Sequence, residues 1–595
     1  MFRLSMCAWA KNVALITSAF ALISCNETVE KIDSKPLSAN KPSGEALVRN
    51  TDKGLVGGMR FDSGVQAWLG IPFAEAPVGQ LRWRAPTMPT AWSGVKAADE
   101  YGAPCVQFPT RMIHGDFEYG DVIGDEDCLY LNVFVPPMVE TSKEKLPVMF
   151  WIHGGGNTTE DTSRYSGEHL AKQQNVIVVS TSYRLGPLGW FRHKELMADY
   201  QSPKDKSGNF ATLDLIRALE WTRDNITTFG GNKENVTIFG ESAGGVNVFS
   251  LLQSPLASGL FHKAITQSGI LSFSSIHSAE EGHVNSSNNI AKRLIKAHDL
   301  PSVESIRALS AKEILAAYRV NTPSHEKELG MFDLPAVIAD GYVLPKNAGI
   351  DVFENNQHNR VPILMGTNRD ESKLFMSIDP NYIDKWFGFW IKSKDRDIYE
   401  RDAYYMSSLW RIIGAENPAR AIHDPVYVYR FDWDELAKVL GMDMPHLIGA
   451  AHVLDVSFVL GEFSLGKDFD RVQQTKKNLQ GREDLSRIMM TYWGNFARTG
   501  NPNIGESVPL EWQPWQQKEQ FIVFDSSNDK GITTSSDSLT PEKLLAQLKA
   551  DKRFQSPHEQ CELLSNMAEH SVAILSWKST ALWMLKQLEH CKASQ

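Results

Sequence analysis

A pentapeptide of the form G-x-S-x-G, Gly240–Gly244 with Ser242 at its centre, carries residue types suited to acyl transfer. It follows the β-rich run Val236–Phe239 and precedes an apolar, helix-like run that begins at Val246. A tight strand-to-helix turn strains the backbone of its central residue, and flanking glycines remove the side chains that would clash. We therefore predict that the Ser242 hydroxyl stands above the edge of a sheet as a nucleophile.

A run of glycines further upstream supplies a second chemical feature. The segment His153–Gly156 (HGGG) directly follows the apolar run Val148–Ile152. Backbone N–H groups in such a run can point into a cavity and stabilise the oxyanion that forms when a serine attacks an ester. A flexible turn is the alternative, but the place after a buried strand and ahead of Ser242 favours an oxyanion loop.

These loops need a rigid scaffold, and the sequence around them predicts one. Further short apolar runs lie at Val176–Val179 and Pro362–Met365, and their near-continuous apolarity is typical of strands buried on both faces. Helical spacing separates the runs, as at Leu215–Leu219. This alternation predicts an α/β fold with a large, mostly parallel sheet covered by helices on both faces. We expect one domain over residues 47–555 and a C-terminal helical extension over residues 556–595.

Several motifs together resemble the type-B carboxylesterase and cholinesterase family of α/β-hydrolases. The segment Phe229–Gly244 is similar to the serine signature of that family, and Glu126–Val133 is similar to its second signature. Three more segments occur in family order: Gly70–Ala74, Tyr183–Gly186 and Asn495–Pro502. The resemblance extends from about residue 47 to about residue 520. It implies the α/β-hydrolase fold and a serine carboxylesterase that works through an acyl-enzyme intermediate.

The resemblance also implies the two partners of Ser242. The acid of the family is a glutamate in a segment like Gly366–Ser372, which makes Glu371 the candidate and Asp370 its rival. The family has glycine where this chain has Ser372. The histidine lies in a segment like that around His452, and His446 is the nearest competitor. The order serine, acid, histidine is the order that this fold uses.

Further roles follow from the same resemblance. The backbone N–H groups of Gly155, Gly156 and Ala243 would bind the oxyanion. Glu241, beside the nucleophile, either tunes the electrostatics or is a structural carboxylate. The chain contains neither an H-E-x-x-H motif nor clustered Cys and His, so we predict no metal and no cofactor.

Two aromatic features bear on the substrate. The resemblance implies that Cys105 and Cys128, which bracket a loop-like segment, close a loop at the wall of the site. In cholinesterases this loop carries a tryptophan that binds choline. Residues 106–127 contain no tryptophan, so we do not expect a choline ester. The aromatic segment Trp386–Trp390 either lines an entrance for a bulky ester or packs a helix onto the core.

The N-terminus has the pattern of an export signal. A positively charged start and the short apolar stretch Val13–Ile23 form a signal peptide over residues 1–24. The tetrapeptide Leu22–Cys25 resembles the lipobox of bacterial lipoproteins, which makes Cys25 the lipidated first residue of the mature chain. Residues 25–46 are polar and predict a flexible tether. We expect a protein of the bacterial periplasm or cell envelope, anchored to a membrane by lipid; a plain secretory signal is the alternative.

The remaining cysteines, Cys561 and Cys591, leave their pairing open. The residues between them contain no Gly or Pro and have helical character. A straight helix of about 30 residues would hold its ends about 45 Å apart, whereas bridged Cα atoms lie about 5.5 Å apart. The two cysteines pair only if the segment between them folds back.

Composition narrows the classes of function. The 595-residue chain has a net charge of −10 and no block rich in Lys and Arg, so nucleic acid is not an expected partner. No internal apolar run reaches the roughly 18 residues of a membrane span. The expected partner is a small-molecule ester, and the sequence predicts no oligomeric state. Two alternatives remain: a catalytically silent binding protein of the same family, and a specialised hydrolase of a plant, toxin or polymer ester.

Overall fold

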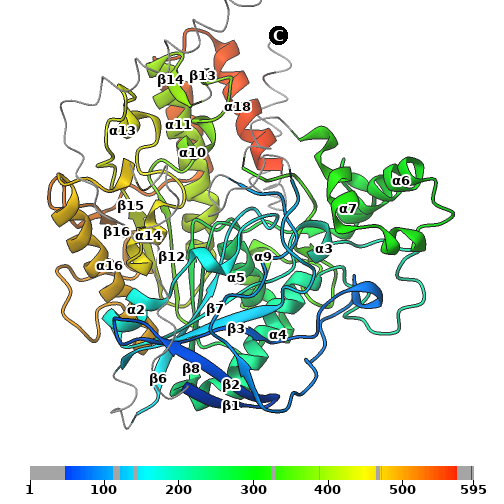
Figure 1. Cartoon of the computed structure of the whole chain (residues 1–595). Coiled ribbons are helices and arrows are strands. Elements are labelled where there is room, and N and C mark those ends of the chain that lie inside the picture. Colours follow the sequence, from blue (N-terminus) through cyan, green and yellow to red (C-terminus); the bar gives the residue numbers. More distant parts are fainter. Residues whose placement is uncertain are drawn as a thin grey trace, which may run out of the picture. The chain divides into compact units, whose positions relative to one another are not determined.

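A 13-stranded sheet runs through the described part of the computed structural model (Figure 1). Its strand order is β1-β2-β3-β5-β7-β6-β8-β9-β12-β15-β16-β17, with β4 beside β2. Neighbours from β7 to β16 are parallel. The pairs from β1 to β7 along this order, and β16 with β17, are antiparallel, whereas β4 is parallel to β2. The strands are β1 (Leu47–Thr51), β2 (Gly54–Arg60), β3 (Gln66–Pro72), β4 (Val95–Ala97), β5 (Tyr130–Val135), β6 (Leu146–Ile152), β7 (Ile177–Thr181), β8 (Gly231–Glu241), β9 (Lys263–Gln267), β12 (Ile363–Asn368), β15 (Val426–Phe431), β16 (Phe521–Phe524) and β17 (Thr533–Ser535).

The structure describes residues 47–110, 121–137, 144–322, 329–387, 389–463, 470, 472–572 and 591. They belong to one compact unit, Glu45–Gln595. The predicted signal peptide, Cys25 and the tether lie outside the described residues.

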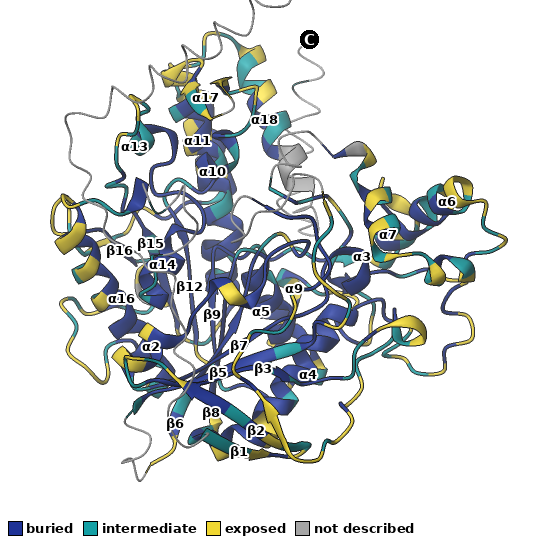
Figure 2. Ribbon diagram, viewed as in Figure 1, coloured by how far each residue is buried: buried dark blue, intermediate teal, exposed yellow. Residues whose placement is uncertain are grey.

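Alternate residues of the central strands enter two different cores. In β6, Val148, Phe150 and Ile152 join one apolar cluster, while Met149 and Trp151 join another on the opposite face. All five are almost completely buried, as Figure 2 shows for the central strands. This two-sided burial explains the continuous apolar runs in the sequence.

Helices cover both faces of the sheet, which confirms the predicted fold class. Helices α4 and α5 contribute to the first cluster, and α2, α14 and α16 contribute to the second. The helices are α2 (Glu168–Gln174), α3 (Gly186–Gly189), α4 (Phe210–Asn225), α5 (Ala243–Gln253), α6 (Ser287–His298), α7 (Ala311–Tyr318), α9 (Ile350–Glu354), α10 (Lys373–Met376), α11 (Arg396–Arg411), α12 (Asn417–Ala421), α13 (Met444–Leu447), α14 (Leu454–Leu460), α16 (Leu479–Thr499), α17 (Pro541–Ala550) and α18 (Pro557–Val572). No helix of this described part is both long and apolar enough to cross a membrane.

The sheet order brings three loops together. Strands β8, β9 and β12 are parallel neighbours, so their carboxyl ends meet at one edge of the sheet. Ser242 follows β8, Ser268 follows β9 and Glu371 lies just beyond β12. Ligands of open α/β sheets bind at this edge.

Two disulfide bonds are present in the described residues, one between Cys105 and Cys128 and one between Cys561 and Cys591. Cys105 bonds to Cys128, as the family resemblance implies. Cys561, on α18, bonds to Cys591 with Cα atoms 5.6 Å apart. A single straight helix between these two cysteines is therefore excluded, and the pairing that the sequence left open is resolved.

The C-terminal helices α17 and α18 pack against α11. Leu409 of α11, Leu544 of α17 and Leu563 of α18 belong to one buried apolar cluster. The boundary predicted at residue 555 lies between α17 and α18, and both helices share this cluster.

The aromatic segment Trp386–Trp390 does not pack as a helix. It joins two antiparallel strands, β13 (Ile383–Trp386) and β14 (Trp390–Ser393), in a hairpin whose tip is exposed. The expectation of a helix packed onto the core is therefore wrong, because the pair Trp386 and Trp390 lies across two strands.

Candidate active site

Ser242 occupies the strained turn that the sequence predicts between β8 and α5. Its φ is 58° and its ψ is −122°, a backbone conformation that non-glycine residues rarely adopt. A Cβ atom at Gly240 would lie 2.7 Å from a carbonyl carbon of Gly244, and one at Gly244 would lie 2.1 Å from the oxygen of Ile152. Only glycines at both positions let the turn pack against the end of β6.

The glycine run after β6 lies against this turn. A Cβ atom at Gly154 would lie 3.1 Å from the Cβ of Ser242. Gly155 and Gly156 have φ of 85° and 61°, and a Cβ at Gly155 would meet the oxygen of Thr159 at 2.1 Å. Within the described residues, neither the Gly155 nor the Gly156 N–H donates a hydrogen bond. These donors are therefore available to a ligand beside Ser242.

Glu371 is completely buried and both of its carboxylate oxygens have partners. Oε2 lies 2.6 Å from Nδ1 of His452. Oε1 accepts hydrogen bonds from the Ser268 hydroxyl at 2.6 Å and from the Asn368 N–H at 2.7 Å. Ser372 has φ of −72°, so this position does not require the glycine of the family.

The imidazole of His452 is held by aromatic rings as well as by Glu371. The ring centroids of Trp410 and Phe375 lie 4.7 Å and 5.6 Å from that of His452. Nε2 has no hydrogen-bond partner among the described residues, and Oε1 of Glu241 lies 3.3 Å from it. Glu241 directly precedes Ser242 in the chain, so the residue next to the strained turn lies beside Nε2.

Burial and neighbouring charges shift the pKa values of Glu241, His452 and Asp455. Burial raises the pKa of Glu241 to about 8, and the charge of His452 opposes this only in part. Burial lowers the pKa of His452, but the charges of Glu241 and Glu371 outweigh burial and raise it to about 9. Burial also raises the pKa of Asp455, which accepts hydrogen bonds from Tyr429 and Gln267.

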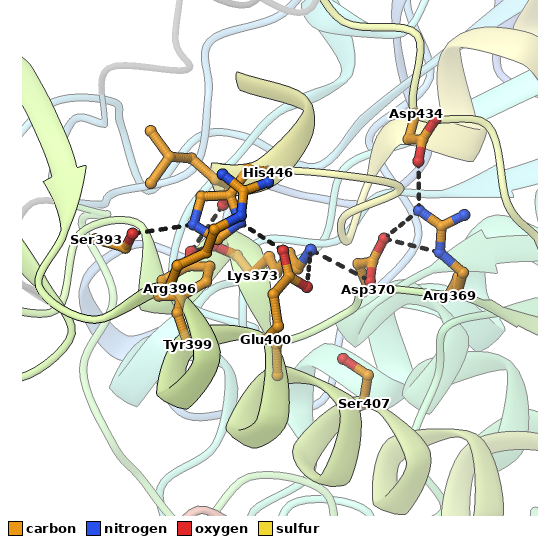
Figure 3. A network of polar contacts seen from close by, with 12 residues as sticks. Arg369, Asp370, Lys373, Ser393, Arg396, Tyr399, Glu400, Ser407, Asp434 and His446 are labelled. Atoms are coloured by element: carbon orange, nitrogen blue, oxygen red, sulfur yellow. Dashed lines mark hydrogen bonds and ion pairs between the residues drawn. The ribbon is translucent and has the colours of Figure 1, made fainter. Parts of the chain in front are cut away.

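The rival acid, Asp370, has a different set of contacts (Figure 3). Its Oδ2 lies 2.7 Å from Nη2 of Arg369 and accepts the Ala450 N–H at 3.0 Å, and its Oδ1 lies 3.6 Å from Nζ of Lys373. Burial opposes ionisation of Asp370, but the charges of Arg369 and Lys373 hold its pKa below the usual value. Asp370 thus fastens the loop that carries His452, while Glu371 contacts the imidazole itself.

The competing histidine, His446, belongs to a separate network (Figure 3). Its Nδ1 lies 2.5 Å from Oε1 of Glu400, and its Nε2 lies 2.9 Å from the Ser393 hydroxyl. Oε2 of Glu400 lies 2.9 Å from Nζ of Lys373. The contacts described for His446 do not include Ser242.

The sequence interpretation missed Ser268, Phe375, Trp410 and Asp455. Ser268 directly follows β9, whose mixed sequence KAITQ contains no apolar run, so no local pattern marked it. Trp410 and Phe375 reach His452 from other parts of the chain, and no local pattern marks them. The described residues contain no cluster of His, Cys, Asp and Glu suited to a metal ion.

Comparison with known proteins identifies the family. A model of the carboxylesterase family matches residues 45–408 and 398–540. A para-nitrobenzyl esterase of Bacillus subtilis is 33% identical over 485 residues, which cover 78% of this chain and 92% of the relative. A pyrethroid hydrolase of Mus musculus is 31% identical over 528 residues, covering 80% and 88%.

Solved structures agree with this result. A para-nitrobenzyl esterase structure has a TM-score of 0.65 and 29% sequence identity, and the match covers 84% of this chain and 99% of that one. A carboxylesterase of Geobacillus stearothermophilus has a TM-score of 0.64 and 28% identity, covering 82% and 98%. The chain therefore belongs to the carboxylesterase family, with the α/β-hydrolase fold, and is a carboxylic ester hydrolase.

Proposed function

We propose that the protein hydrolyses carboxylic esters through a Ser242–His452–Glu371 triad. Ser242 Oγ attacks the ester carbonyl while His452 Nε2 takes its proton. Glu371 holds Nδ1 protonated and stabilises the imidazolium that forms. The observation that supports this assignment is the 2.6 Å contact between Glu371 Oε2 and His452 Nδ1, together with an unpaired Nε2 that lies 3.3 Å from Oε1 of Glu241, the residue before Ser242.

The glycine run and the start of α5 complete the mechanism. The N–H groups of Gly155, Gly156 and Ala243 receive the oxyanion, and one such donor is worth about 3 kcal/mol to the transition state. His452 then protonates the leaving alcohol, and water attacks the acyl-enzyme with His452 again as the base. No step needs a metal or a cofactor.

Export and lipid anchoring are part of the proposal. The segment before Cys25 supports a lipoprotein signal, and the 22 residues from 25 to 46, most of them polar, would separate the lipid from β1. The enzyme would then act in the bacterial periplasm or cell envelope on small esters. The relatives named for para-nitrobenzyl and pyrethroid esters support aryl and bulky esters as suitable probes.

The first test uses the chain from Asn26 onward, which retains the whole compact unit. We expect it to hydrolyse p-nitrophenyl esters from acetate to octanoate, and Ser242→Ala to reduce turnover to background because the nucleophile is lost. The dependence on acyl length measures the acyl pocket. Equal inertness of both proteins, with no organophosphate attached to Ser242, would instead support the silent binding protein.

The two neighbouring acids give a matched pair of variants. Glu371→Gln should lower kcat about 10³–10⁴-fold, because the neutral amide no longer favours the imidazolium. Asp370→Asn should keep kcat within about tenfold but lower the denaturation midpoint, because it weakens a buried ion pair. Steady-state kinetics and urea unfolding measure both. The reverse pattern would make Asp370 the catalytic acid.

The pH profile tests the charges around His452. Only neutral imidazole acts as the base, and its pKa is raised to about 9, so kcat/KM should increase with pH from neutral toward pH 9. Glu241→Gln removes a charge that raises this pKa, so the rising limb should move to lower pH. A limb near pH 6.5 in the parent, unmoved by Glu241→Gln, would contradict this account.

The lipid anchor has its own test. In a bacterial host that processes lipoproteins, the full chain should sediment with membranes. Replacing the signal segment with a plain secretory signal and Cys25 with Ser should yield an active enzyme that a high-salt wash removes from membranes without detergent. If the variant chain still required detergent for extraction, the anchor at Cys25 would be excluded as the main attachment.

A further inference from the structure

An exposed apolar tip projects from the hairpin of β13 and β14. Phe387, Phe389 and Trp386 have exposed fractions of 89%, 52% and 42%, and the neighbouring Leu440 is 73% exposed. Trp390 joins the two turns, since its indole N–H donates to the Leu440 oxygen at 3.0 Å. Figure 1 shows the hairpin at the top of the view, away from the central sheet. We call these five residues the aromatic tip.

The backbone holds two of these side chains outward in an unfavourable conformation. Phe387 has φ of 53° and Leu440 has φ of 50°, in the left-handed region that favours Gly, Asn and Asp. Turns with only a structural role usually have Gly, Asn or Asp at left-handed positions. Here large apolar side chains occupy both positions, so the two turns carry strain and expose apolar surface together.

The base of the hairpin is fixed to the body of the protein. Ser393, the last residue of β14, bonds to His446, and His446 bonds to Glu400 of α11 (Figure 3). The buried Ile383 contributes to the apolar cluster on one face of the sheet. These contacts attach the base of the hairpin to α11 and to the apolar cluster, while the aromatic side chains at its far end stay exposed.

The charges beside the tip are mainly positive, although the whole chain has a net charge of −10. Lys385, Lys392 and Lys394 of the hairpin are exposed, and Asp384, opposite Lys392, is the acid within residues 383–394. Lys438 and Asp443, on either side of Leu440, form an ion pair of their own, so cations outnumber acids across the two turns and complement an anionic surface.

We propose that the aromatic tip inserts into the interface of a bilayer that contains anionic phospholipid. Tryptophan and phenylalanine side chains are stabilised at the boundary between headgroups and acyl chains, and nearby lysines attract anionic headgroups. The aromatic tip combines five apolar side chains with nearby lysines, and this combination favours an anionic lipid surface as its partner. This contact is separate from the lipid expected on Cys25.

The test uses the chain from Asn26 onward, which cannot be lipidated at Cys25. We expect it to sediment with vesicles of phosphatidylcholine and phosphatidylglycerol, and less with phosphatidylcholine alone. The triple variant Phe387→Asn, Phe389→Ser and Leu440→Asn should bind about tenfold or more weakly, because apolar groups are lost from the interface. Asparagine tolerates the left-handed backbone, so both turns remain favourable.

Matched variants separate the causes. Ile504→Ser and Val284→Ser remove exposed apolar residues elsewhere, 56% and 48% exposed, and should leave vesicle binding unchanged. Lys392→Glu should reduce the preference for phosphatidylglycerol. Unchanged hydrolysis of a soluble p-nitrophenyl ester by the triple variant shows that the fold is intact and keeps this test independent of the catalytic assignment.

Three outcomes would overturn the proposal. The first is that the parent chain binds neither kind of vesicle at low salt, and the second is that the triple variant binds as the parent does. The third is a dimer, seen by light scattering without vesicles, that the triple variant loses, which would assign the tip to a second copy of the chain.

Discussion

The close approach of backbone to backbone at the Ser242 turn is the constraint on which the site depends. Glycines at 240 and 244 let the turn contact the end of β6, and a Cβ at Gly245 would lie 2.7 Å from Gly269, just beyond β9. The proposed nucleophile, Ser242, therefore keeps its position only while β6, β8 and β9 remain adjacent and parallel. The sheet order is thus a condition for the geometry of the site, and the strain at Ser242 is maintained by the packing of the surrounding strands.

A second constraint is electrostatic. Glu241, Glu371 and Asp455 all raise the pKa of one buried histidine, while burial lowers it. Burial alone would leave His452 a weak base, and a histidine with a single carboxylate would be less basic than this one. Because the pKa of His452 is raised, its neutral, basic form becomes populated only at alkaline pH. The same carboxylates stabilise the imidazolium that each proposed proton transfer produces.

The parts of this structure that local sequence could predict are those in which neighbouring residues share one environment. The apolar runs at β6 and β7 follow from burial on both faces, and the Ser242 turn follows from its glycines. Glu371 and His452 needed the family resemblance, because 80 residues separate them and only the tertiary fold joins them. Trp410 and Phe375 could not be predicted, because the sequence does not distinguish an aromatic residue that packs on the His452 ring from any other aromatic residue of the core. The hairpin of β13 and β14 was misread because exposed aromatic residues at a turn are contrary to the usual link between apolar residues and burial.

The network around His446 contains a hydrogen-bonded serine, histidine and glutamate but lacks the backbone features found at Ser242. Ser393, His446 and Glu400 are joined at 2.9 Å and 2.5 Å, and the chain order serine, acid, histidine is also that of Ser242, Glu371 and His452. Ser393, however, lacks the positive φ of Ser242, and the glycine run after β6 lies against Ser242. Residue types and hydrogen bonds thus occur in both places, whereas the strained turn and the adjoining glycine donors occur together at Ser242. These backbone features, more than the triad of side chains, distinguish a site built for acyl transfer from a polar network that supports a hairpin.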